Sequence, residues 1–264
     1  MGLRSSEHRQ GYVRASFAWG KYQFLDMIPP LAKRLSMQAS DHAFQATIPV
    51  RLPYRVFLPD RYNPSGSTDY PLIIFLHGAG ARGEDLAQVE ELGLADKLAR
   101  GYSLPFIVVA PQCPRNLDWS MILPALDALV LHIVQTFRVD PDRVYLTGLS
   151  MGGFGVWALA TAYPYHFAAV APVCGGGRRQ LDFPDRLRNI VHLPVWCFHG
   201  DQDAEIPVEE SLRMVQALKN YGGDVRCSIY SGLGHDSWTR TYDNPELYRW
   251  FLSHTRIRTC SQAP

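Results

Sequence analysis

The chain has 264 residues, of which 47% are hydrophobic and 19% charged, enough apolar sequence for one large globular domain. Its formal net charge is +1 and it has no long basic run, so no nucleic-acid partner is expected. No apolar stretch approaches the roughly 20 residues of a membrane helix, and the polar N-terminus lacks the apolar segment of a secretory signal. We therefore expect no membrane span and a cytoplasmic location.

The first 40 residues show no clear pattern, and we expect an N-terminal extension over residues 1–40 followed by a single domain over residues 41–264. The domain begins with two expected strands, 42–50 and 54–59, as an antiparallel hairpin or meander. Residues 61–71 are rich in turn-forming side chains and predict a loop.

From residue 72 onward, apolar runs alternate with segments of helical spacing. This alternation predicts βαβ units on a parallel sheet. The expected strands are 72–78, 105–111, 142–148, 167–175, 194–200 and 224–232. The expected helices are 85–101, 121–137, 152–164, 208–223 and 244–254.

The segment TGLSMGGFG, residues 147–155, places one serine among four glycines at an expected strand-to-helix corner. Gly148, Ser150 and Gly152 match G-x-S-x-G, a turn that presents a nucleophilic serine at the N-terminus of a helix. Backbone N–H groups there favour developing negative charge. The alternative is an ordinary serine in a glycine-rich turn. A dinucleotide-binding fingerprint fails, because Ser150 replaces a glycine that G-x-G-x-x-G requires.

A serine nucleophile needs a base, and the base needs an orienting acid. His235 lies in a loop after the last expected strand, and Asp201 and Asp203 follow the strand before it. The order Ser, Asp, His is the order expected when such a serine turn is catalytic. His77 and His199 also end strands, but each precedes a glycine and falls in the wrong order.

A second glycine-rich loop, residues 77–85, follows the expected strand 72–78. An oxyanion hole needs one N–H from the residue after the nucleophile and one from this loop. We therefore predict the backbone N–H groups of Met151 and Ala79 as the oxyanion-hole donors. The five cysteines show no CxxC spacing, so we expect reduced thiols and no metal site.

Five segments carry a resemblance to a known family: PLIIFLHGAGARGED, VVAPQCP, GLSMGGFGVWALA, PVWCFHGDQDAEIPVEES and GLGHDSW. Together they resemble the α/β-hydrolase superfamily over residues 54–252, especially compact bacterial esterases labelled "predicted peptidase". These are similar to feruloyl esterases and distantly to dienelactone hydrolases and prolyl oligopeptidase. The resemblance implies an α/β fold whose mostly parallel sheet has antiparallel N-terminal strands, helices on both faces and no large lid.

The family pattern H-G-x-x-D-x-x-[VI]-P assigns the acid to Asp203, with Asp201 as the fallback. The resemblance also implies that Gln112 and Trp119 lie near the mouth of the site, and Trp238 follows His235 closely enough to form a wall. Packing is the alternative role for each of these three side chains.

The predicted activity is that of a serine carboxylesterase acting on short-acyl or aryl esters, with feruloyl-type esters among them. Only about twenty residues separate the strands 167–175 and 194–200, which favours an open cleft and a small-molecule ester substrate. No cofactor or metal is implied, and the oligomeric state is not indicated. The alternatives are a peptidase or amidase with the same triad, and a non-catalytic binding protein of the same fold.

Overall fold

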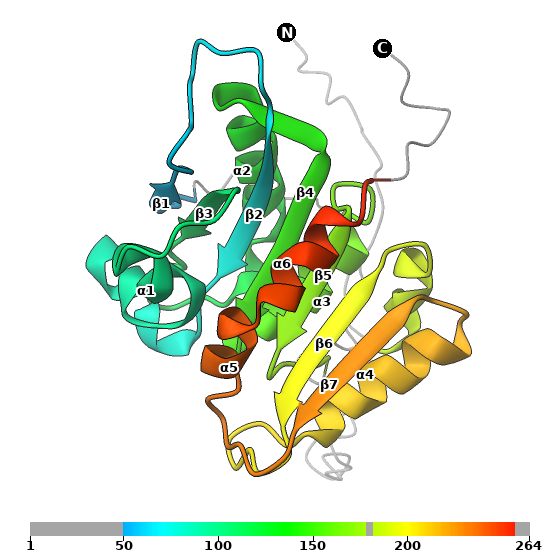
Figure 1. Ribbon diagram of the computed structural model, residues 1–264. Coiled ribbons are helices and arrows are strands. Elements are labelled where there is room, and N and C mark those ends of the chain that lie inside the picture. The colour runs from blue at the N-terminus through cyan, green and yellow to red at the C-terminus, as the bar shows by residue number, and fades with distance from the viewer. Residues whose placement is uncertain (1–49, 178–181, 257–264) are drawn as a thin grey trace, which may run out of the picture. The chain divides into compact units, whose positions relative to one another are not determined.

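The computed structural model describes residues 50–177 and 182–256. Seven strands there form one sheet in the order β1-β3-β2-β4-β5-β6-β7 (Figure 1). β1 pairs antiparallel with β3, and the other neighbouring strands are parallel. The strands are β1 (Tyr54–Phe57), β2 (Tyr70–Leu76), β3 (Ile107–Pro111), β4 (Val139–Leu149), β5 (Ala169–Val173), β6 (Val195–Gly200) and β7 (Val225–Tyr230). The predicted, mostly parallel sheet is confirmed.

Helices cover both faces of the sheet, with α5 and α6 in front of the strands in Figure 1 and α2 and α3 behind them. The α-helices are α1 (Gly93–Ala99), α2 (Leu123–Thr136), α3 (Met151–Ala162), α4 (Glu209–Asn220), α5 (Trp238–Asp243) and α6 (Pro245–Leu252). Short 3-10 helices occur at η2 (Ala79–Ala81), η3 (Leu86–Glu91), η4 (Trp119–Met121) and η5 (Asp185–Ile190). Local sequence sets some of these ends: Asn244 caps α6, accepting a hydrogen bond from the N–H of Glu246, and Pro245 occupies the first turn.

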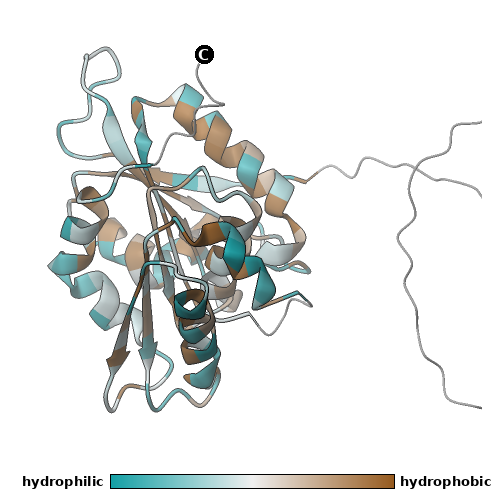
Figure 2. Ribbon diagram, turned by 90° about the vertical axis from the view of Figure 1, so that its right-hand side faces the viewer, coloured by the Kyte–Doolittle hydropathy of each residue, from teal (hydrophilic) through white to brown (hydrophobic). Residues whose placement is uncertain are grey.

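The continuous apolar run of β2 arises because both of its faces are buried. Leu72, Ile74 and Leu76 point into the core under α2, α3 and α4, whereas Ile73 and Phe75 point into the core under α1, α5 and α6. Figure 2 shows hydrophobic residues along the strands, whereas the covering helices carry both hydrophobic and hydrophilic residues. Each such side chain contributes about 1.5–3 kcal/mol of burial, and together they make the sheet a rigid support for its loops.

The single helix predicted over residues 85–101 is wrong, because η3 and α1 are separated at Leu92, whose backbone is extended. Gly93 has φ +71°, and a Cβ there would lie 2.5 Å from Cδ2 of Leu149 and 3.0 Å from Cζ of Phe75. The break therefore lets the backbone pack directly beneath the end of β4. Apolar spacing could not reveal it, because the cause is a contact distant in sequence.

The N-terminal part of the domain is only partly described. β1 is antiparallel as predicted, and its observed partner is β3. The strand predicted at 42–50 lies almost entirely outside the described residues, as does the extension predicted over 1–40. Among the described residues, no helix is both long and apolar enough to cross a membrane.

Candidate active site

Ser150 stands at the corner between β4 and α3, half-buried, with φ 55° and ψ −117°. Its flanking glycines are required by close backbone packing. A Cβ on Gly152 would lie 1.9 Å from the carbonyl oxygen of Leu76, and one on Gly148 would lie 2.7 Å from the same oxygen. α3 therefore packs so closely against β2 that no side chain fits at Gly148 or Gly152. This close packing sets the position of the Ser150 hydroxyl at the helix N-terminus.

His235, in the loop after β7, has Nε2 3.0 Å from Oγ of Ser150 and Nδ1 2.7 Å from Oδ2 of Asp203. An ionised carboxylate only accepts hydrogen bonds, so Nδ1 carries the proton and Nε2 is free to accept the Ser150 hydroxyl proton. The imidazole side chain is 14% exposed. The structure thus brings the predicted nucleophile, base and acid together in hydrogen-bonding order.

Asp203 follows β6, and its side chain is fully buried. Oδ1 accepts hydrogen bonds from the N–H groups of Glu205 and Ile206, each at 2.9 Å. Burial by itself would raise the pKa of Asp203, but the hydrogen bonds from His235 and the backbone outweigh it and hold the pKa below its usual value. The fallback acid Asp201 accepts a hydrogen bond from the N–H of Gly232 at 2.7 Å, and thereby holds a turn.

The loop after β2 lies against Ser150, since a Cβ on Gly78 would be 3.7 Å from the Ser150 Cβ. Ala79 begins η2 and is exposed, and Met151 begins α3. In the described part of the chain, neither residue's N–H donates to a backbone acceptor. Both N–H groups are therefore available to a ligand, which the predicted oxyanion-hole role requires.

His77 holds this loop in place. Its Nδ1–H donates to the carbonyl oxygen of Gly78 at 2.6 Å, and its Nε2 accepts the N–H of Cys113 at 2.9 Å. Burial, opposed by the Gly78 hydrogen bond and reinforced by the nearby Arg82 charge, lowers the pKa of His77 to about 4. The imidazole is therefore neutral at pH 7, which its acceptor role at Nε2 needs.

Gln112 and Trp119 are both fully buried and form hydrogen bonds with the loop after β2. Gln112 donates from Nε2 to the carbonyl oxygens of Ala81 and Asp85, and Trp119 donates from Nε1 to that of His77. Trp238 packs edge-on against the His235 ring, with centroids 5.2 Å apart. Substrate contact by these three side chains stays a prediction.

Three residues near the predicted triad have no role predicted from the sequence: Cys174, His199 and Glu205. Cys174 accepts the N–H of Ser150 at its sulfur (3.3 Å), and His199 binds Asp203 from the side opposite the solvent. Glu205 is exposed, with Oε2 3.6 Å from Nε2 of His235. No sequence signal separates these residues from ordinary packing or surface positions.

Cys174, Asp203 and His235 have ligand-type atoms within 4.8 Å of one another, the spacing of a candidate metal site. The donor set does not suit a cation, because burial raises the pKa of the Cys174 thiol well above its usual value and metals bind the thiolate. The facing atoms of Asp203 and His235 are also already bonded to each other.

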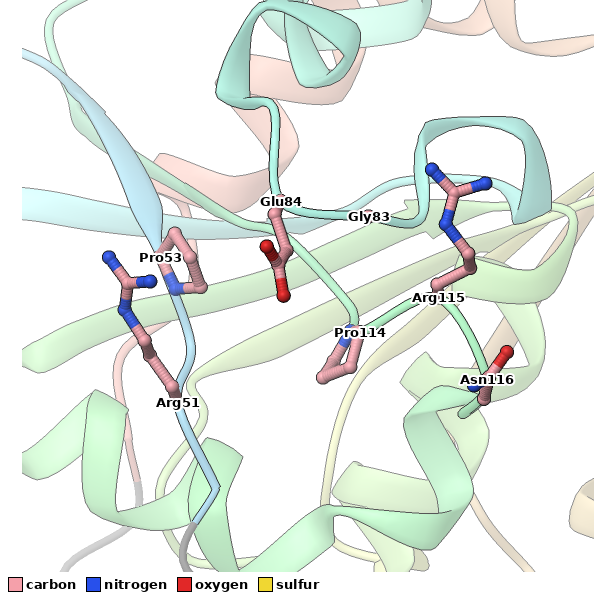
Figure 3. A pocket seen from close by; sticks show the side chains of 7 residues that line it. All are labelled: Arg51, Pro53, Gly83, Glu84, Pro114, Arg115 and Asn116. Atoms are coloured by element: carbon pink, nitrogen blue, oxygen red, sulfur yellow. The ribbon is translucent and has the colours of Figure 1, made fainter.

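A surface pocket of about 430 Å³ lies beside the loop after β2, which contributes Gly83 and Glu84 to its lining (Figure 3). In this view Glu84 lies between Pro53 and Pro114, with Arg51 to one side and Arg115 to the other. None of the predicted site residues lines this pocket.

Comparisons with known proteins give one family match and several similar esterases. A family model described as the dienelactone hydrolase family matches residues 112–247, about half of the chain. The putative esterase NocK of Nocardia uniformis subsp. tsuyamanensis is 32% identical over 148 residues, which cover 53% of this chain and 42% of NocK. A probable feruloyl esterase C of Aspergillus clavatus is 26% identical over 184 residues, covering 67% of this chain and 63% of that protein.

Among solved structures, the chain is similar to a thermostable esterase, with 34% identity and a TM-score of 0.67, covering 78% of this chain and 60% of that one. The chain therefore spans less than two thirds of each of these three proteins. The structural match confirms the predicted α/β-hydrolase fold.

Proposed function

Because the chain belongs to the dienelactone hydrolase family, we propose that it is a serine esterase that hydrolyses carboxylic esters through Ser150, His235 and Asp203. One observation carries the proposal: Oγ of Ser150 lies 3.0 Å from Nε2 of a histidine whose other nitrogen is bonded to a buried carboxylate. This is the arrangement that converts a weakly nucleophilic hydroxyl into an attacking group.

The proposed reaction has two acyl-transfer steps. His235 takes the proton of Ser150 as its oxygen attacks the ester carbonyl, and the N–H groups of Ala79 and Met151 stabilise the oxyanion. Asp203 keeps the imidazole in the correct tautomer and stabilises its charged form. His235 then protonates the leaving alcohol, and a water molecule activated by the same histidine hydrolyses the acyl-enzyme.

Short-acyl and aryl esters, including feruloyl-type esters, are the proposed substrates. The names of NocK and of the Aspergillus protein support ester hydrolysis. In the described stretches between β5 and β6, the helical structure is the six-residue η5, and this short connection supports a site open to small esters. We also propose that residues 41–264 form the catalytic domain; the cytoplasmic location stays a prediction.

The test is a set of initial rates on p-nitrophenyl esters from acetate to palmitate, on methyl ferulate and on a peptidyl anilide, for the wild type and Ser150→Ala. We expect the highest kcat/KM at short acyl chains and its loss in the variant. Anilide cleavage comparable to ester cleavage would instead assign a peptidase. Ester turnover that survives in Ser150→Ala would refute the proposed nucleophile.

A further inference from the structure

A second histidine binds the proposed catalytic acid. His199 is the penultimate residue of β6, and its side chain is 0% exposed. Its Nε2 lies 3.1 Å from Oδ2 of Asp203 and 2.9 Å from the carbonyl oxygen of Ile206. Oδ2 is also the oxygen that accepts the Nδ1–H of His235. Two imidazoles therefore share one carboxylate oxygen, one from the protein interior and one from the active-site loop.

The direction of the hydrogen bond from His199 follows from its partners. A backbone carbonyl accepts and never donates, and the low pKa of Asp203 keeps its carboxylate ionised and accepting. Nε2 of His199 must therefore carry a proton and donate it. The opposite nitrogen, Nδ1, lies 2.7 Å from Oγ of Ser211 on α4, so the ring is held at both ends.

This donor completes the hydrogen bonding of Asp203. Oδ1 takes two backbone N–H groups, and Oδ2 takes one N–H from each histidine. The terminal torsion of an aspartate is broad, so a carboxylate with fewer partners rotates easily. With four donors around it, Oδ2 stays in line with Nδ1 of His235.

The same contacts tie the acid to the region behind the nucleophile. Oγ of Ser211 also lies 2.8 Å from the carbonyl oxygen of Gly175, just after β5, so its one hydroxyl proton is placed between Nδ1 of His199 and that oxygen. Gly175 packs against Gly153 of α3 so closely that a Cβ on it would lie 2.5 Å from the Gly153 carbonyl carbon. His199 thus lies in a chain of contacts that runs from α4 to both the acid and the helix that begins after Ser150.

We propose that His199 is a positioning residue, which holds Oδ2 of Asp203 on the line to His235 and so sets the orientation of the catalytic base. This role rests on the proposed serine-esterase function. It predicts that what matters is an N–H at the Nε2 position and not the imidazole as such.

Two amide variants separate the N–H from the bulk of the side chain. In His199→Gln the amide nitrogen replaces Nε2 and reaches Asp203, whereas in His199→Asn it replaces Nδ1 and reaches only Ser211. We expect kcat on p-nitrophenyl acetate to fall about 30-fold in His199→Asn, with KM within about twofold, because a displaced acid misorients the base. His199→Gln is expected to retain kcat within about threefold.

A spectroscopic measurement tests the same claim without turnover. The far-downfield proton signal of the His235 Nδ1–H, assigned by its absence in His235→Gln, reports the bond to Asp203. It is expected to persist in His199→Gln and to disappear in His199→Asn. If the ester panel shows no Ser150-dependent turnover, the proposed function fails, yet this signal still decides the positioning role.

Equal kcat losses in the Asn and Gln variants, or an unchanged kcat and proton signal in His199→Asn, would overturn the proposal. If His199→Asn does not fold, Ser211→Ala replaces it, since it keeps both histidines and removes only the hydroxyl that orients His199. An approximately fivefold lower kcat with unchanged KM and a broadened signal is then expected. An unchanged kcat and signal in Ser211→Ala would refute the role.

Discussion

Replacing Gly152 by alanine tests whether the glycine spacing around Ser150 is a steric requirement. The added Cβ would lie 1.9 Å from the carbonyl oxygen of Leu76 and 2.6 Å from its carbonyl carbon. Both are backbone atoms of β2 that cannot rotate away. Since contacts of this kind stay above about 3 Å in folded proteins, α3 must retreat from the sheet by roughly 1 Å, and Ser150 moves with it.

A displacement of about 1 Å at a reacting group costs on the order of 100-fold in rate, and overpacking a core costs about 1–3 kcal/mol of stability. We therefore expect Gly152→Ala to lower kcat on p-nitrophenyl acetate about 100-fold and to lower Tm measurably. The matched control is Gly66→Ala, whose Cβ meets only the side chain of Asn63, at 3.3 Å, in an exposed loop. A Gly152→Ala enzyme with wild-type kcat and Tm would refute the steric argument.

Two further predictions concern charge. The folded-state pKa of His77 is about 4, so between pH 6.5 and pH 4 the unfolded chain binds a proton at His77 that the folded chain does not. As the pH drops through that window, His77 should therefore lower the free energy of unfolding by about 3 kcal/mol. Urea unfolding at pH 7 and pH 4 should show a correspondingly smaller fall in His77→Asn, and an identical fall would contradict the assigned burial effect. A leaving oxygen that takes its proton from His235 lies within about 7 Å of the Glu205 carboxylate. A cationic leaving group should therefore be favoured there, and the ratio of kcat/KM for acetylcholine to that for the neutral 3,3-dimethylbutyl acetate should drop about threefold in Glu205→Gln. The control Glu209→Gln, at an exposed position, should leave that ratio unchanged, and equal ratios in all three proteins would exclude a role for Glu205.

The features that could be predicted from the sequence are those determined by the local pattern of apolar residues and glycines. β2 was predicted because burial on both faces demands an unbroken apolar run. The corner at Ser150 was predicted because a backbone contact as close as that of Gly152 admits only glycine. Chain order and the family pattern predict Asp203 and His235 as its partners, and the structure places His235 beside Ser150 and Asp203 beside His235. Their catalytic roles stay predictions.

What sequence did not indicate depends on contacts between distant segments. The break before α1 follows from the packing of Gly93 under Leu149. The burial of Gln112 follows from its contact with η2 and the residues after it, where the carbonyl oxygens of Ala81 and Asp85 accept hydrogen bonds from its Nε2. Chain order excludes His199 as the catalytic base, but chain order does not indicate that His199 hydrogen-bonds to Asp203.

The most direct test of the central claim is covalent labelling of the nucleophile. The wild type is incubated with a fluorophosphonate, and the adduct is located by peptide mass spectrometry. A single adduct on Ser150, formed at a rate that falls sharply in His235→Gln, is the result predicted by a serine activated through the 3.0 Å contact with His235. An unlabelled Ser150 in a protein that still hydrolyses esters would contradict the account.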